Sequence, residues 1–187
     1  MAVRNKTPFI PNEIYFITFT ILGWKNIFNN KKYYNLIYKW FDYMKEKYEN
    51  KIYGYVIMPN HIHCLIKITD KSPKLSIFIN NAKRFLAYQI VQLLKEDNNS
   101  GLLDFFKSRA RIKTGAKHKI FEDRYDSLII GTQKFFLEKL NYIHRNPCAK
   151  KWRLTEKPEN YKYSSASNYI LGIGIYNVDN NGFYVNG

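Results

Sequence analysis

Residues 55–66 read YVIMPNHIHCLI, and this stretch decides the fold because a tight turn joins two strand-forming runs within it. The runs are rich in β-branched and aromatic residues, and residues 58–60 between them, Met-Pro-Asn, are a turn signal. The stretch therefore predicts an antiparallel hairpin, with strands over residues 52–57 and 62–68.

Two histidines, His61 and His63, stand two residues apart where the second strand begins. Side chains at i and i+2 of a strand project from the same face, so both imidazoles can reach one metal ion or one phosphate. The residues expected on the opposite, core-facing side are Ile62, Cys64, Ile66 and Ile68. Imidazole binds Mg, Mn, Zn, Cu or Fe, so the pair does not identify a metal. Hydrogen bonds to structural partners are the alternative role for both rings.

The segments on either side of the hairpin complete a ferredoxin-like order. The expected elements are a strand over 14–21, a helix over 32–48, the hairpin, a helix from Pro73 to Glu96 ended by residues 97–101, a strand over 125–130 and a helix over 133–146. This order predicts an α+β fold: a ferredoxin-like antiparallel sheet with helices on one face, plus an additional C-terminal helix.

The length of 187 residues suits one domain with a sizeable core. We expect the core over about residues 14–157, and an irregular tail lying over the domain at residues 158–187. Two cysteines, Cys64 and Cys148, do not make a disulfide framework. The sequence shows neither a signal peptide nor an apolar run of ~18 residues, so we expect a soluble, cytoplasmic protein without a membrane partner.

The chain is strongly basic, with 30 Lys and Arg against 15 Asp and Glu and a formal charge of +15. A positive surface field favours a polyanionic partner. Aromatic residues make up 17% of the chain, and base stacking on aromatic rings beside basic residues is how proteins hold single strands. Nucleic acid is therefore favoured over a membrane surface, although most of these rings are expected to build the core.

Residues 107–120 form a basic segment without a single acidic residue. Its cations are Lys107, Arg109, Arg111, Lys113, Lys117 and Lys119. We interpret the segment as a basic loop or ribbon that contacts phosphates. A solvated surface hairpin is the alternative.

The helix expected over residues 133–146 has a flank beside its apolar stripe that carries Phe135, Tyr142 and Asn146. Its apolar stripe consists of Phe136, Leu140 and Ile143. Residues four apart are stacked on a helix surface, so the Asn146 amide oxygen can lie close to the Tyr142 hydroxyl. This spacing suits a nucleophile with an accessory metal ligand. The alternative is structural: Tyr142 at the core edge, and Asn146 ending the helix before Pro147.

A zinc site is a further interpretation of the same part of the sequence. It would consist of His61, His63, His144 and Cys148, of which the last two are an i, i+4 pair. Neither CxxC nor HExxH spacing supports it.

With these motifs in order, the chain resembles the single-tyrosine HUH transposases, and in particular the branch known as REP-associated tyrosine transposases. The resemblance rests on YVIMPNHIH at 55–63, FEDRYD at 121–126, YIHRNP at 142–147 and YSSA at 163–166. The matching pieces span about residues 14–169. Four ordered segments make the match specific, whereas any one alone is weak.

The resemblance implies a role for each matched residue. His61 and His63 would be the HUH pair that binds a divalent cation, Mg²⁺ or Mn²⁺, and Asn146 would complete the metal site. Tyr142 would attack a phosphodiester of single-stranded DNA, giving a 5′-phosphotyrosine link and a free 3′-OH that later rejoins strands. The expected substrate carries hairpins at repeat or element ends. Arg124 and Arg145, within the matched segments, join the basic segment as DNA-contact candidates.

Two departures from the family pattern concern DNA contacts more than chemistry. The family commonly has Trp-Gln where this chain has Phe121 and Glu122, and often a histidine where it has residues 126–128. A non-catalytic module that binds single-stranded nucleic acid stays the alternative, because ferredoxin-like sheets with aromatic residues also bind RNA. A monomer and a homodimer are both compatible with the sequence.

Overall fold

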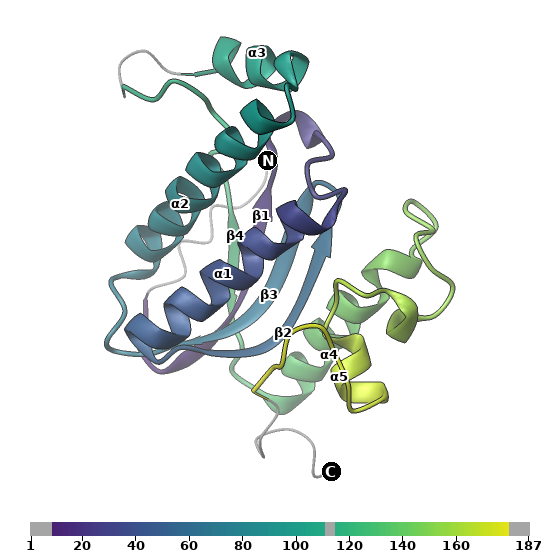
Figure 1. Ribbon diagram of the computed structural model, residues 1–187. Helices are drawn as coiled ribbons and strands as arrows, with labels where there is room; N and C mark the ends of the chain where they lie inside the picture. The colour runs from purple at the N-terminus through teal and green to yellow at the C-terminus, as the bar shows by residue number, and fades with distance from the viewer. Residues whose placement is uncertain (1–8, 111–114, 180–187) are drawn as a thin grey trace, which may run out of the picture.

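The structure is a computed structural model that describes residues 9–110 and 115–179 (Figure 1). Its strands are β1 (Glu13–Thr20), β2 (Lys51–Met58), β3 (His61–Ile68) and β4 (Asp126–Ile129). Its α-helices are α1 (Lys31–Tyr48), α2 (Leu75–Glu96), α3 (Ser100–Ser108), α4 (Gln133–Arg145) and α5 (Ala166–Ile170), with short 3-10 helices η1 (Leu22–Trp24), η3 (Asn146–Cys148) and η4 (Pro158–Asn160). None of the helices in this described part is long and apolar enough to cross a membrane.

The four strands form one antiparallel sheet in the order β2-β3-β1-β4. The β2-β3 hairpin pairs Met58 with His61 across the turn, and β1 pairs Thr18 with His63. This order is that of a ferredoxin-like sheet, so the predicted fold is confirmed.

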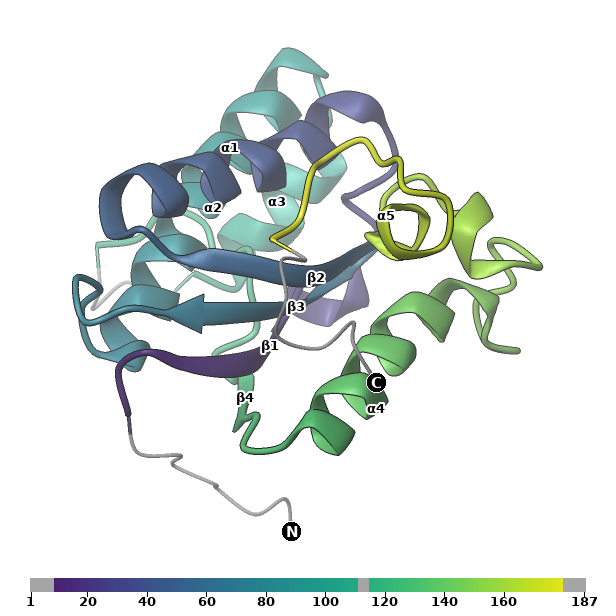
Figure 2. The same cartoon turned by 90° about the horizontal axis from the view of Figure 1, so that it is seen from below.

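Helices α1 and α2 cover one face of the sheet (Figure 2). The helix α1 begins where the Asn30 side chain accepts a hydrogen bond from the backbone N–H of Lys32. The sheet residues beneath the two helices include Ile17, Phe19 and the predicted core set Ile62, Cys64, Ile66 and Ile68, all fully buried. This layer is the main apolar core.

Helix α4 lies against the opposite face of the sheet (Figure 2). Its predicted stripe of Phe136, Leu140 and Ile143 packs in a second, smaller apolar cluster with Phe16, Val56 and Leu65. Gly54 on β2 permits the close approach, because a Cβ atom there would lie 2.7 Å from Leu140 Cδ1. The additional C-terminal helix is thus set apart from α1 and α2 by the sheet.

Helix α3 was not predicted. The turn signal at residues 97–101 does end α2, and Asn98 there has a positive φ of 53°. A new helix then starts at once, because the Asn99 side chain accepts from the backbone N–H of Leu102 and caps it. Lys107 therefore lies on a helix and not in the expected loop or ribbon.

The segment after α4 is less irregular than expected. It contains η4 and α5, and it runs beside β2. The backbone N–H of Ile57 donates to the carbonyl of Tyr163, and that of Ser165 donates to the carbonyl of Tyr55, both at 2.9 Å. Residues 158–179 therefore lie along the outer edge of the sheet.

Candidate active site

The two histidines lie together on the face of the sheet that α4 covers. His61 and His63 are each only 6% exposed, and their ring centroids are 4.7 Å apart. Alternation along β3 puts both on this face and puts Ile62, the residue between them, on the other. The first requirement of the predicted pair, a shared face, is met by the strand geometry.

A hydrogen bond at Nδ1 fixes each imidazole ring. His63 Nδ1 lies 2.8 Å from Thr18 Oγ1, and His61 Nδ1 lies 2.8 Å from Asn60 Oδ1. The Asn60 amide nitrogen donates to the carbonyl of Trp24, so its Oδ1 faces His61 and accepts the Nδ1 proton. The Nε2 lone pair of His61 is then the one available to a cation, an arrangement typical of histidine ligands.

Burial keeps both rings neutral at pH 7. Loss of solvent lowers the pKa of His61 to about 4, with a smaller contribution from the charge of Lys151. The pKa of His63 falls to about 3, again mainly through burial and then through His61 beside it. Neutral imidazole is the form that binds metal ions.

Asn146 follows the last residue of α4 and lies beside His61, with which its side chain interacts. Its Oδ1 atom is buried and has no hydrogen-bond partner among the described residues. A buried acceptor without a partner costs about 1–3 kcal/mol, and a cation at this point would satisfy it. Two imidazole nitrogens and one amide oxygen fit a divalent cation.

The zinc interpretation is wrong. Within residues 9–110 and 115–179, no three His, Cys, Asp or Glu side chains are grouped to hold a metal ion. His144 is turned to other partners: its Nε2 lies 2.9 Å from Ser165 Oγ, and its ring lies 5.3 Å from that of Tyr169.

Tyr142 projects from α4 next to the histidine pair. Its ring centroid is 5.2 Å from that of His63 and 5.9 Å from that of Phe16, yet the residue is 49% exposed. The side chain thus borders the site on one side and solvent on the other. About half of the residue is therefore accessible from solvent without a change in the fold.

Lys139 is a neighbour of Tyr142 that was not singled out from the sequence. It lies one helical turn earlier, and its Nζ is 5.9 Å from the Tyr142 ring and 5.7 Å from the Phe16 ring. The i, i+3 spacing on α4 is the signal that could have found it. Its ammonium group adds positive charge beside the candidate nucleophile.

The described DNA-contact candidates are spread over the surface. Lys107 lies in the last turn of α3, Arg109 lies 5.5 Å from the Phe105 ring, and Lys119 pairs with Asp123 at 2.8 Å. The remaining described candidates, Lys117, Arg124 and Arg145, are exposed. Arg111 and Lys113 lie outside the described residues.

The basic segment ends close to the histidines. The backbone N–H of Leu22 donates to the carbonyl of Ile120, and that of Gly23 donates to Glu122 Oε1. These bonds join the end of the segment to η1, whose last residue, Trp24, contacts His61. The end of the basic segment, at Ile120, is therefore joined to η1 beside the histidine pair.

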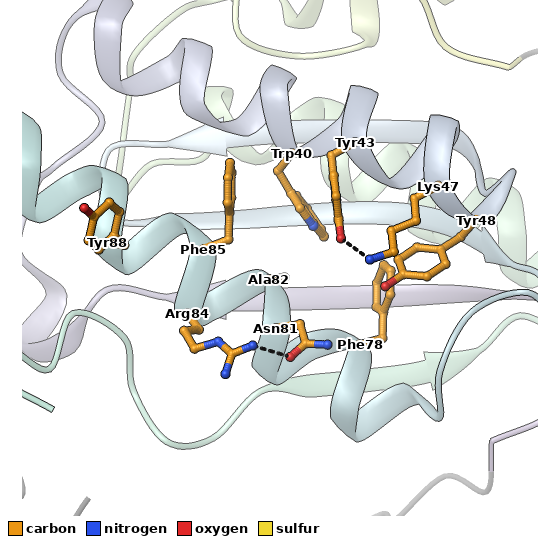
Figure 3. Close-up of a pocket in the computed structure, with 10 residues that line it drawn as sticks. All are labelled: Trp40, Tyr43, Lys47, Tyr48, Phe78, Asn81, Ala82, Arg84, Phe85 and Tyr88. Atoms are coloured by element: carbon orange, nitrogen blue, oxygen red, sulfur yellow. Dashed lines mark hydrogen bonds between the residues drawn. The ribbon is translucent and has the colours of Figure 1, made fainter. Parts of the chain in front are cut away.

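A cavity of about 490 Å³ lies on the other side of the sheet, between α1 and α2 (Figure 3). Its walls are mainly aromatic, and its polar groups bond to one another: Lys47 donates to the Tyr43 hydroxyl, and Arg84 to the Asn81 amide oxygen. The cavity is separated from His61 and His63 by the sheet. It contributes nothing to the site.

Comparison with known proteins identifies the family of the chain and agrees with its fold. Residues 14–146 match the family described as Transposase IS200 like, and the chain belongs to this family. The matched range runs from β1 to the end of α4, so it includes the histidine pair and Tyr142. A family of transposases makes the protein a DNA-processing enzyme by class.

One solved structure is similar over the whole chain. It is a REP-associated tyrosine transposase bound to a REP hairpin, and it matches with a TM-score of 0.62 and 16% sequence identity. The match covers 100% of this chain and 95% of the other. At this identity the likeness shows the fold alone. No curated protein sequence matches the chain.

Proposed function

We propose that the protein is a metal-dependent transposase that cleaves and rejoins single-stranded DNA through a covalent bond to Tyr142. The observation that carries the proposal is the half-exposed Tyr142 ring 5.2 Å from His63, on the face that holds two neutral imidazoles and the unpartnered Asn146 oxygen. An accessible phenol, a metal-binding pair and a third ligand are the parts that this chemistry needs.

His61, His63 and Asn146 would hold a divalent cation, Mg²⁺ or Mn²⁺. When bound there, the cation supplies Lewis-acid polarisation of a phosphate oxygen. The residues behind the ligands keep the rings in place: Thr18 bonds to His63, and Asn60 bonds to His61. These bonds hold each ring in one orientation.

The cleavage step is a displacement at phosphorus. The Tyr142 oxygen forms a bond to the phosphorus atom as the bond to the 3′ oxygen breaks. The phenol proton is lost to solvent, and the leaving 3′ oxygen takes up a proton from solvent. The products are a 5′-phosphotyrosine and a strand that ends in a 3′-OH. Lys139 stabilises the negative charge around the phosphate, since its ammonium group lies beside the Tyr142 ring.

Rejoining is the reverse displacement. A 3′-OH attacks the phosphotyrosine, the bond to Tyr142 breaks, and the phenol regains a proton. The number of phosphoester bonds is unchanged, so no external energy source is required. The side chain is exposed enough for a second strand to approach it.

We propose DNA with hairpins as the substrate, because the similar solved structure is described as bound to a REP hairpin. The +15 charge of the chain suits any DNA, and the bond between Leu22 and Ile120 brings the end of the basic segment close to the site.

The test is covalent capture. The protein is incubated with labelled single-stranded hairpin oligonucleotides in Mn²⁺ or in EDTA, and denaturing electrophoresis separates protein-linked DNA. We expect an adduct that requires Mn²⁺ and is absent in Tyr142→Phe. An adduct retained in this variant would show that the nucleophile is a different residue. Tight binding without an adduct from any hairpin would favour the non-catalytic binding module.

A further inference from the structure

Two tryptophans from distant parts of the chain meet at His61. Trp24, at the end of η1, has its ring centroid 6.2 Å from that of His61. Trp152 lies in the turn that follows α4 and η3, and its ring centroid is 5.5 Å from that of His61. The fold therefore gathers two indoles at the edge of the candidate metal site.

Lys151 joins the two rings. Its Nζ lies 4.9 Å from the centroid of Trp24 and 5.4 Å from that of Trp152, both within cation–π range. No carboxylate in the part of the chain that the structure describes forms an ion pair with it. The cluster of Trp24, Lys151 and Trp152 is hereafter the indole clamp.

Trp24 is exposed but held firmly. It is 56% exposed, and its φ of 55° lies in the left-handed region that a bulky residue rarely adopts. Its N–H donates to the Ile21 carbonyl, and its carbonyl accepts from the Asn60 amide. A large apolar ring kept in solvent by a costly backbone conformation indicates a binding role.

Asn60 couples the exposed ring to the site. Its amide nitrogen donates to the Trp24 carbonyl while its Oδ1 accepts from His61. The position of Trp24 therefore depends on the position of His61. A ligand that sits on Trp24 is therefore placed at a defined distance from the metal-binding face.

We propose that the indole clamp is a nucleotide-binding site: it stacks an unpaired base next to the scissile phosphate, and Lys151 contacts the neighbouring backbone phosphate. Aromatic faces with an adjacent cation are how proteins hold single-stranded DNA, and a base inside a duplex does not offer its face to a ring. The inference rests on the proposed function, because it locates the base beside the phosphate that Tyr142 attacks.

The test separates binding from chemistry. The protein carries Tyr142→Phe and is kept in EDTA, so that neither cleavage nor metal binding occurs. It is titrated with an oligothymidylate of about 15 nucleotides while tryptophan fluorescence is recorded. The chain has three tryptophans, and Trp40 is buried between α1 and the sheet, so quenching by a base reports on Trp24 and Trp152.

We expect strong quenching in the parent protein, and Trp24→Leu to weaken binding about 10-fold and to remove much of the quenching. Lys151→Gln is expected to weaken binding less and to lower its salt dependence. Tyr88→Leu, at an exposed aromatic residue on α2, is the matched control and should change neither signal. A strand with abasic sites should bind the parent protein as weakly as the intact strand binds Trp24→Leu.

Unchanged affinity and quenching in Trp24→Leu would overturn the inference. So would unchanged binding with a reduced yield of adduct in the Tyr142 parent, because Trp24 would then only shield His61 from water. If no adduct ever forms but quenching depends on Trp24, the strand-transfer proposal fails and the indole clamp stands.

Discussion

The two faces of the sheet differ although the same strands build them. On the face beneath α1 and α2, strands β1 and β3 place Phe19, Ile62 and Cys64, all fully buried in an apolar layer. One residue away on the α4 face, the same strands place Thr18, His61 and His63. A shift of one position along a strand thus separates the groups that stabilise the fold from the groups proposed to act in it.

Cys64 and His63 show what the difference does to reactivity. Both are buried neighbours on β3. Burial raises the pKa of the Cys64 thiol well above its ordinary value, so this thiol is inert. Burial lowers the pKa of His63, which leaves a lone pair available for a metal ion. The same loss of solvent makes one side chain passive and prepares the other for binding.

The largest expected effect tests which face holds the nucleophile. Tyr142→Phe should reduce the rate of adduct formation at least about 1,000-fold, because no other group would attack the phosphate. Tyr88→Phe removes a hydroxyl from an exposed tyrosine on the opposite side and should leave the rate unchanged. Both variants should unfold at the parent temperature, since neither side chain is in the core. An equal loss of rate in both variants would contradict the proposal that the nucleophile lies on the α4 face.

Metal binding should also belong to one face. Mn²⁺ at 100 times its dissociation constant should stabilise the parent protein by about 2.7 kcal/mol, measured as a rise in the unfolding temperature. The His61→Ala and His63→Ala double variant should lose this rise. His118→Ala, at a partly exposed histidine before Ile120, is the control that should keep it. A rise that survives in the double variant would place the metal elsewhere.

The buried histidines predict a dependence of stability on pH. In the metal-free protein the pKa values of His61 and His144 fall to about 4, and that of His63 to about 3, all below the ordinary value of about 6.5. Between about pH 6.5 and 4 the unfolded chain therefore binds more protons than the folded one.

The free energy of unfolding should then have its highest value above pH 6.5 and fall as the pH drops through this window. We expect a loss of about 2 kcal/mol for each of the three rings by about pH 5, measured by urea unfolding at several pH values. His63→Gln should reduce the dependence of the unfolding free energy on pH. Cys64→Ala, on the other face, should lower the unfolding free energy by the same amount at every pH. A curve that is flat in the parent protein would mean that the three rings are not held neutral.

The smallest expected effect concerns the basic segment. Arg109→Glu with Lys117→Glu should weaken binding of single-stranded DNA about 10-fold and reduce the salt dependence by roughly one ion per lost phosphate contact. Lys47→Glu with Arg84→Glu reverses the same number of charges at the cavity between α1 and α2. That control should keep the parent salt dependence. Identical slopes for the two variants would remove the basic segment from the interface.

Local patterns predicted most of the fold and the position of the main site residues. The alternation in β3 gave the shared face of His61 and His63, and helical spacing gave Tyr142 and Asn146 their common flank. Helix α3 could not be predicted from the sequence pattern, because it is short and begins directly after a turn signal. The indole clamp could not be predicted for a different reason. Trp24 and Trp152 are far apart in the chain, and only the packing of α4 on the sheet brings them together.

The segment beside β2 has a consequence for association between molecules. An uncovered edge strand offers free N–H and C=O groups to any extended chain and invites sheet-to-sheet pairing. In this protein Tyr163 and Ser165 bond to β2, and the backbone and side chain of Asp179 bond to Ile52 farther along the strand. Another molecule would have to displace this segment to extend the sheet through β2. Truncation before Pro158 would therefore expose the unpaired backbone groups of β2, and an increase in aggregation would follow.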